Sequence, residues 1–206
     1  MEKHFELTQE YKINFLGIKL FRIKATKKSK YVNEGEVGGW VEKEECLSGN
    51  AWVFGDAEVF GNARVFGDAE VFGDARVFGN ARVFGNAWVF GNAWVFGDAE
   101  VFGDARVFGN ARVSGNARVS GNAWVFGDAE AKSNNDYCCF QNFGSENRTT
   151  TFFKEKDNKI KVSCGCFSGS IEEFEKEVRK THGEGKNAKE YISIIEVVKI
   201  KFGLQP

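Results

Sequence analysis

The side chains with the strongest potential for chemistry are the histidines and cysteines. They are His4, His182, Cys46, Cys138, Cys139, Cys164 and Cys166. Cys164 and Cys166 alternate along a predicted strand, so we expect their side chains to point the same way. With Cys138 and His182 they could bind zinc, but the C-x-C spacing is a weaker signal than C-x₂-C. We therefore predict buried structural thiols, with no metal and no cofactor.

A second group of residues could hold an anion. Arg112 and Arg118 lie six residues apart, and each is followed two residues later by a serine. These serines are Ser114 and Ser120, and Trp124 comes next in the same rhythm. Arginine beside an aromatic ring can bind a planar anion such as a nucleotide. The sequence leaves two simpler explanations open, namely that a flanking segment packs over the serines or that the repeat has drifted.

These positions belong to a six-residue repeat that runs from Leu47 to Glu130. The typical phrase is Val-Phe-Gly-(Asp/Asn)-Ala-(Glu/Arg/Trp), and about 14 such hexads follow one another without insertion. Ala and Val alternate with larger residues, which is the periodicity of a strand with one buried face. Gly followed by Asn or Asp suits a corner, because these residues tolerate left-handed backbone conformations. The repeat predicts a mainly β protein built around a β-solenoid.

The hexads resemble those of left-handed parallel β-helix proteins, the hexapeptide-repeat acyltransferase superfamily. This resemblance implies a left-handed triangular coil of three hexads, or 18 residues. Charge placement supports the 18-residue register, because Glu100 then lies between Arg82 and Arg118. An acyltransferase is accordingly one alternative function. Enzymes of the superfamily carry a catalytic histidine on the coils or on an inserted loop, whereas both histidines here lie outside the repeat, so we predict a non-enzymatic protein.

The repeat also explains why the chain has 21 Phe and 24 Gly residues. Phe follows Val in most hexads and is expected on the outside of the coil, where it forms three ladders. The most apolar surface is the predicted interface, which comprises Trp52, Phe54, Phe72, Trp88, Phe90, Phe108, Trp124 and Phe126. The rings could stack and stay half exposed, or the surface could be buried by another copy, by the terminal segments or by a foreign protein. We favour self-association, and the superfamily resemblance implies a trimer.

The flanks of the repeat have different compositions, and the chain is therefore divided at 40 and 131. Residues 1–40 are predicted to form a β-hairpin cap around Gly17, and residues 41–131 the solenoid. Residues 132–206 are predicted to form a small α+β domain with three strands, at 137–141, 149–155 and 160–166. Two helices follow, the first beginning with a capping box at Ser170 and Glu173, the second capped within 187–190.

Charge and hydropathy limit the partners. The net charge of −1 gives no general attraction to nucleic acid or anionic membranes. No run of about 18 apolar residues could cross a membrane. Met1 is followed directly by Glu2 and Lys3, with no apolar segment suited to a secretory signal. An odd number of cysteines is typical of free thiols in a reducing compartment. We therefore expect a cytoplasmic protein that binds neither membrane nor nucleic acid.

Phrases in both flanks suggest a narrower resemblance. They are Gly38-Gly39-Trp40-Val41, the nine residues Val-Ser-Cys-Gly-Cys-Phe-Ser-Gly-Ser ending at Ser170, and Thr181-His182-Gly183. With the hexads, they resemble uncharacterised hexapeptide-repeat proteins of phages and prophages. The resemblance implies an accessory protein of the host cytoplasm and supplies no reaction. We predict a binding or scaffold protein that acts on itself or on a host protein, with sequestration of a nucleotide or other small anion as an alternative.

Overall fold

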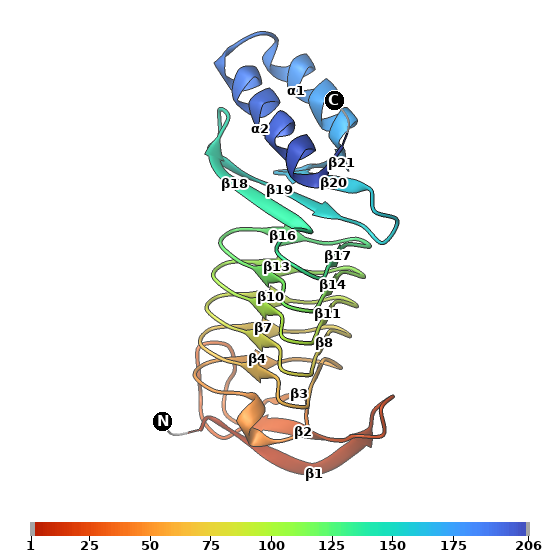
Figure 1. The fold of residues 1–206 in the computed structure, drawn as a ribbon. Helices are drawn as coiled ribbons and strands as arrows, with labels where there is room; N and C mark the ends of the chain where they lie inside the picture. The colour runs from red at the N-terminus through yellow and green to blue at the C-terminus, as the bar shows by residue number, and fades with distance from the viewer. Residues whose placement is uncertain (1–2, 205–206) are drawn as a thin grey trace.

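A computed structural model describes residues 3–204. Met1, Glu2 and the only proline, Pro206, lie outside this range. A parallel β-solenoid of about five turns stands between an N-terminal hairpin and a C-terminal α+β region, as Figure 1 shows. The mainly β fold and the solenoid predicted from the hexads are confirmed.

The rod consists of two-residue strands, one in each hexad. They are β4 (Trp52–Val53), β5 (Glu58–Val59), β6 (Arg64–Val65), β7 (Glu70–Val71), β8 (Arg76–Val77), β9 (Arg82–Val83), β10 (Trp88–Val89), β11 (Trp94–Val95), β12 (Glu100–Val101), β13 (Arg106–Val107), β14 (Arg112–Val113), β15 (Arg118–Val119), β16 (Trp124–Val125) and β17 (Glu130–Ala131). Each strand from β4 to β14 pairs in parallel with the strand three places further on, so that Trp88 lies opposite Arg106. This pairing confirms the 18-residue register and produces three separate sheets.

The core of the rod is formed by the alanine and valine of each hexad, which are fully buried. The corners depend on glycine for two reasons. Gly85, for example, has a φ of +74°, and a Cβ atom there would lie 2.9 Å from the backbone nitrogen of Gly103 in the next coil. A side chain would therefore be strained by its backbone conformation and would collide with the neighbouring coil.

The polar residues after these glycines form columns in which amides donate to carboxylates. The side chain of Asn50 donates to Asp68 at 2.9 Å, and that of Asn86 donates to Asp104 at the same distance. In these columns each carboxylate has an amide beside it, whereas Asp56 and Asp74 place two carboxylates in successive coils of another column.

The N-terminal hairpin extends one sheet of the rod. Strands β1 (Phe5–Ile13) and β2 (Lys19–Ala25) flank a turn at Gly17, and β3 (Val37–Val41) pairs with both β2 and β5. The predicted hairpin around Gly17 is present. The short helix η1 (Glu44–Cys46) leads into the next coil. Gly39 allows this close packing, because a Cβ there would lie 2.5 Å from the Val53 side chain.

The C-terminal region contains four strands, one more than predicted. They are β18 (Tyr137–Phe143), β19 (Arg148–Lys154), β20 (Ile160–Cys164) and β21 (Phe167–Ser170). The positive φ of Gly165 turns the chain after β20, so the strand expected at 160–166 ends at Cys164 and an additional strand, β21, follows the turn. Helices α1 (Ile171–His182) and α2 (Lys186–Phe202) follow. The capping box at Ser170 and Glu173 is confirmed, whereas the N-cap of α2 is Gly185 rather than a residue within 187–190.

No helix within residues 3–204 is both long and apolar enough to cross a membrane.

Candidate functional site

The three sheets give the rod three outer faces of different character. We call the outer side of the β4–β7–β10–β13–β16 sheet, together with its flanking Phe ladder, the aromatic face. Its strand residues form one column along the rod, and they are Trp52, Glu70, Trp88, Arg106 and Trp124. The outer side of the sheet that includes β1 is the hairpin face, and that of the β6–β9–β12–β15 sheet is the charged face.

The ladder beside this column consists of stacked, half-buried phenylalanines. The ring centroids of Phe90 lie 4.7 Å from those of both Phe72 and Phe108, and the rings are nearly parallel. The Arg106 guanidinium lies between two indoles, 4.4 Å from the ring centre of Trp88 and 5.2 Å from that of Trp124. Because rings and cation stack along the rod axis, mainly their edges face outward.

Trp52 is an exception among the predicted interface residues. Its side chain is fully buried, with the His4 ring 5.5 Å and the Phe5 ring 6.5 Å away. Burial also lowers the pKa of His4, since the charged imidazolium would lose its hydration there. Trp52 is therefore part of the N-terminal cap and does not belong to the candidate surface. The sequence did not predict this burial, because nothing in the repeat shows which coil the cap covers.

The hairpin face is partly covered by the chain itself. The turn of the β1–β2 hairpin brings Phe15 to 5.6 Å from the Trp94 ring and within contact of the Phe60 and Phe78 rings. Arg76 packs over both Phe15 and Trp94. The hairpin turn therefore covers aromatic rings of the hairpin face, none of which belongs to the predicted interface.

The charged face has an outward column of Arg64, Arg82, Glu100 and Arg118. Glu100 forms ion pairs with the arginines on both sides, at 3.9 Å to Arg82 and 2.8 Å to Arg118. A polar groove of about 570 Å³ follows the lower part of the column. The predicted position of Glu100 between Arg82 and Arg118 is confirmed, and such exposed pairs are each worth only about 0.2–1 kcal/mol.

The residues predicted to form an anion-binding notch are not brought together. Strands β14, β15 and β16 belong to three different sheets, so Arg112, Arg118 and Trp124 project from three different faces. Two of them already have partners: Arg112 packs over the Trp94 ring at 4.9 Å, and Arg118 pairs with Glu100. The prediction of one site conflicts with the three-hexad coil, because a step of six residues moves the chain to the next face of the rod.

The serines mark the place where the chain leaves the rod. A Cβ on Gly115 would lie 2.3 Å from the Lys132 carbonyl oxygen, and Ser114 is buried. The Asn134 side chain accepts from the Arg118 backbone N–H at 2.8 Å, and the Tyr137 hydroxyl donates to the Arg118 carbonyl. A phenylalanine at 114 or 120 would occupy space that the departing segment needs. The structure thus supports the packing of a flanking segment over the serines.

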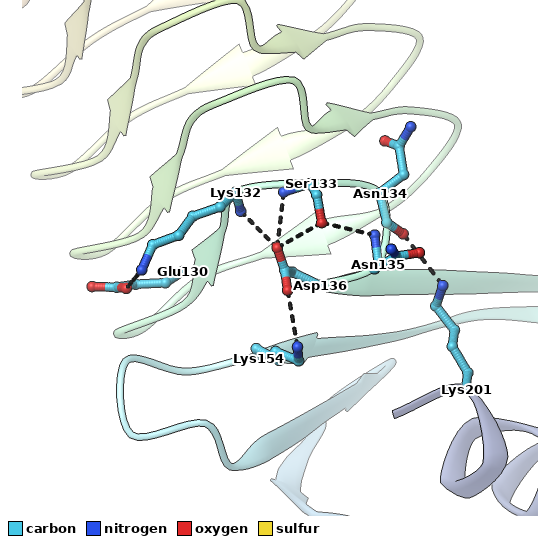
Figure 2. Close-up of polar contacts among 8 residues, drawn as sticks. All are labelled: Glu130, Lys132, Ser133, Asn134, Asn135, Asp136, Lys154 and Lys201. Carbon is cyan, nitrogen blue, oxygen red and sulfur yellow. Dashed lines mark hydrogen bonds and ion pairs between the residues drawn. The ribbon is translucent and has the colours of Figure 1, made fainter. Parts of the chain in front are cut away.

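Asp136 fixes this departing segment to the C-terminal sheet, as Figure 2 shows. Its carboxylate accepts from the backbone N–H groups of Lys132 and Ser133, from the Ser133 hydroxyl and from the Lys154 ammonium. Burial alone would raise the pKa of Asp136, but these hydrogen bonds outweigh it and the net pKa is lowered. Lys201, at the end of α2, donates to the Asn134 carbonyl.

Three of the four candidate metal ligands, Cys164, Cys166 and His182, line one cavity of the C-terminal region, whereas Cys138 lies apart from them. Cys164 is buried at the end of β20, whereas Cys166 is exposed in the following turn, so the prediction that both lie on one strand is wrong. Cys138 lies opposite Phe152 and Cys164 opposite Thr150, which separates these two thiols. Burial raises the pKa of Cys138 to about 12. Within residues 3–204, no three His, Cys, Asp or Glu side chains form a group suited to a metal ion.

Two cavities adjoin in the C-terminal region. The domain cavity, of about 330 Å³, includes Cys166, His182, Tyr191, Glu146 and Glu177 in its wall. The junction cavity, of about 240 Å³, lies between the last coil and the C-terminal sheet. It is lined by Asn122, Trp124, Arg148, Thr149, Thr151, Ser163 and Gly165. Arg148 lines both cavities.

Sequence reasoning did not select Arg148. It stands outside the repeat, and nothing in its local spacing relates it to Trp124, 24 positions earlier. Only the folding of β19 across the end of the rod brings them to one cavity. The one available signal was Trp124 itself, the last tryptophan of the repeat.

Comparison with known families supports the solenoid. The family model described as the YdcK beta solenoid repeat matches residues 75–91 and 111–127. The two segments begin two coils apart, at Ala75 and Ala111. No curated protein matches the chain significantly. The chain is therefore a β-solenoid repeat protein, similar over these coils to the YdcK repeat.

Proposed function

We propose that this protein is a non-enzymatic scaffold that associates with a second copy of itself through the aromatic face. The observation that carries the proposal is the difference in cover between the faces. Phe15 packs on the hairpin face, and ion pairs dominate the charged face. On the aromatic face, the ring and cation contacts of Trp88, Phe90 and Arg106 all come from the face itself. Monomeric proteins rarely leave a contiguous apolar surface of this kind open.

The order of the central column supports pairing of identical faces. Glu70 precedes Trp88 by one coil, and Arg106 follows it by one coil. If two copies pack in opposite directions about a two-fold axis at Trp88, Glu70 of each lies opposite Arg106 of the other. A two-fold contact joins the same patch on both subunits, so one column supplies both halves of each ion pair. The trimer implied by the superfamily resemblance is the alternative assembly.

Sedimentation of Phe90→Glu against wild type tests the association. Phe84→Glu is a matched control, because Phe84 is also half buried and stacked between two rings, but on the charged face. We expect the mass to fall to that of a monomer for Phe90→Glu and to remain oligomeric for Phe84→Glu. A wild-type chain that sediments as a monomer, or equal effects of the two substitutions, would contradict the proposal.

Charge exchange tests the antiparallel arrangement separately. Glu70→Arg and Arg106→Glu should each weaken the association by placing like charges opposite each other, and the double variant should restore it. A double variant weaker than both single variants would refute the two-fold contact and leave the trimer, whose subunits run in one direction.

Three finer features also belong to this proposal. We propose that the coil is left-handed with 14 hexads, which the uninterrupted repeat and its superfamily resemblance support. We propose a phage or prophage accessory role, supported by the phrases in both flanks, with a host protein as the alternative partner. A cytoplasmic location is supported by five unpaired cysteines.

A further inference from the structure

The column of the aromatic face ends differently from the way it begins. Trp124 is the last member, and no further coil pairs with β16. Arg106 covers one side of the indole, and the side chain of Trp124 remains 37% exposed and borders the junction cavity. Where the next coil would have offered a backbone carbonyl, the Thr151 hydroxyl accepts from the Trp124 N–H at 3.2 Å. The backbone N–H of Trp124 therefore has a hydrogen-bond partner, whereas no further side chain of the column stacks on the outer side of its indole ring.

The junction cavity also contains a cation without an anionic partner. Among residues 3–204, Arg148 forms no ion pair with a carboxylate, although most exposed arginines of the rod have an ionic or aromatic contact. Its guanidinium lies directly over Gly165, where a Cβ atom would be 2.5 Å from one nitrogen. The missing side chain at 165 leaves the space in which the guanidinium rests.

The charges around Arg148 indicate on which side an anion would bind. Glu146 and Glu177 line the domain cavity, where they would repel it. The junction cavity has no acidic residue in its wall, and it offers the Asn122 amide and the hydroxyls of Thr149 and Ser163 instead. An anion at Arg148 is therefore favoured on the side that also contains the exposed indole.

We infer that the junction cavity binds a small planar anion, an aromatic ring that carries a carboxylate or phosphate group. The ring would continue the stack on Trp124, and the acidic group would accept hydrogen bonds from Arg148. Arginine is suited to this recognition, because its planar guanidinium can bind both oxygens of a carboxylate or phosphate. The cavity of about 240 Å³ is smaller than the roughly 300–1,000 Å³ of typical ligand sites, which favours a small ligand of one or two rings.

Titration with a matched panel tests both parts of the inference. Benzoate and phenyl phosphate carry ring and charge, cyclohexanecarboxylate carries charge without a planar ring, and benzyl alcohol carries a ring without charge. The five tryptophans give separate indole N–H signals in NMR spectra. We expect benzoate or phenyl phosphate to shift the Trp124 signal selectively, with weaker binding of the other two compounds. Failure of both aromatic anions to bind at millimolar concentration would overturn the inference.

Two variants and one control locate the site. Arg148→Gln should weaken binding of the aromatic anion about tenfold or more, as expected for loss of a charge-assisted hydrogen bond. Trp124→Leu should weaken it several-fold, and Trp124→Phe, which keeps a ring, should weaken it less. Arg112→Gln removes an arginine from the hairpin face and should leave binding unchanged. Equal affinity of Arg148→Gln and wild type, or a loss in Arg112→Gln of the same size, would refute the assignment.

The test is independent of self-association. Arg148 lies outside the aromatic face, so Arg148→Gln should sediment with the wild-type mass while its affinity for the anion falls. Loss of both properties in this variant would show that the cavity exists only in the assembled protein and would overturn the inference of a site within one chain.

Discussion

The two ends of the aromatic column carry the same residue in opposite situations. At the N-terminal end, Trp52 is fully buried by His4 and Phe5. At the C-terminal end, Trp124 is 37% exposed and borders a cavity. The difference comes from how each end of the rod is closed. The N-terminal segment packs the His4 and Phe5 side chains against Trp52. The C-terminal sheet provides only a hydrogen-bond acceptor, the Thr151 hydroxyl, for the backbone N–H of Trp124 and leaves the indole ring partly uncovered.

The C-terminal end is closed by crossing strands and side-chain groups. Thr151 on β19 accepts from Trp124, and Asn134 accepts from the Arg118 backbone. Phe153, also on β19, contacts Phe126 edge to face. An end coil must satisfy its unpaired backbone groups and cover its core. The two ends show that the backbone groups can be satisfied and the core covered with or without burial of the outer tryptophan. We therefore expect the partial exposure of Trp124 to have little effect on the free energy of unfolding.

Truncation of the two tryptophans should give the largest contrast. We expect Trp52→Ala to lower the free energy of unfolding by about 3–5 kcal/mol, because a large buried side chain leaves a cavity. Trp124→Ala should cost about 1 kcal/mol, as its ring is partly solvated already. Urea unfolding followed by far-ultraviolet circular dichroism measures both. Equal losses would show that the two ends are closed in the same way.

Refilling the ladder at the C-terminal end should have the next largest effect. Ser114→Phe restores the repeat but places a ring where the segment after Lys132 leaves the coil, and overpacking of this kind costs about 1–3 kcal/mol. Ser114→Ala, which adds no bulk, is the control and should be close to neutral in thermal unfolding. A stabilised Ser114→Phe variant would show that the serine does not make room for the chain.

Loss of the Asp136 carboxylate should loosen the C-terminal attachment. Asp136→Asn replaces charge-assisted hydrogen bonds with neutral ones and should cost about 1–2 kcal/mol. Because the pKa of Asp136 is lowered in the folded state, its contribution is present above the unfolded value of about 3.9 and is lost as the pH falls through the folded value. Wild type should therefore lose its advantage over Asp136→Asn below about pH 4. An advantage that persists at lower pH would contradict this role.

The N-terminal end should respond to pH in a different range and by a smaller amount. The pKa of His4 is lowered by burial, so the unfolded chain takes up protons more readily. Stability should fall as the pH drops below about 6.5, the unfolded value, towards the folded one. His4→Leu should flatten the melting temperature between pH 7 and pH 5, whereas Asp136→Asn should leave this range unchanged. A wild-type profile that is flat there would exclude titration of His4.

The sequence predicts the repeating part of the fold far better than its ends. Each corner glycine and each alanine–valine pair is repeated in the next coil, so a single local rule, applied at an interval of 18 residues, gives the register. The caps lack such repetition. Burial of Trp52 depends on a distant residue, His4. The extra strand β21 depends on a turn at Gly165, and the alternating sequence around this glycine looks like one continuous strand.

The candidate sites divide in the same way. The stacked Phe ladders follow directly from the repeat, and the structure reproduces their spacing. The notch was predicted from proximity along the chain, although the triangular 18-residue coil predicted from the same repeat already places consecutive hexads on different faces. Arg148 was missed because its proximity to Trp124 arises from the path of β19, a long-range property that no local pattern encodes.

Because the register is uniform, the length of the rod increases by the same step with every coil. Every coil has the same cross-section, and adjacent coils are separated by one strand spacing of about 4.8 Å. Deletion or duplication of 18 residues within the repeat would keep the order of the three faces and both end contacts, while changing the reach between hairpin and C-terminal region by one such step. The distance between the N-terminal hairpin and the C-terminal region is therefore adjustable in whole coils.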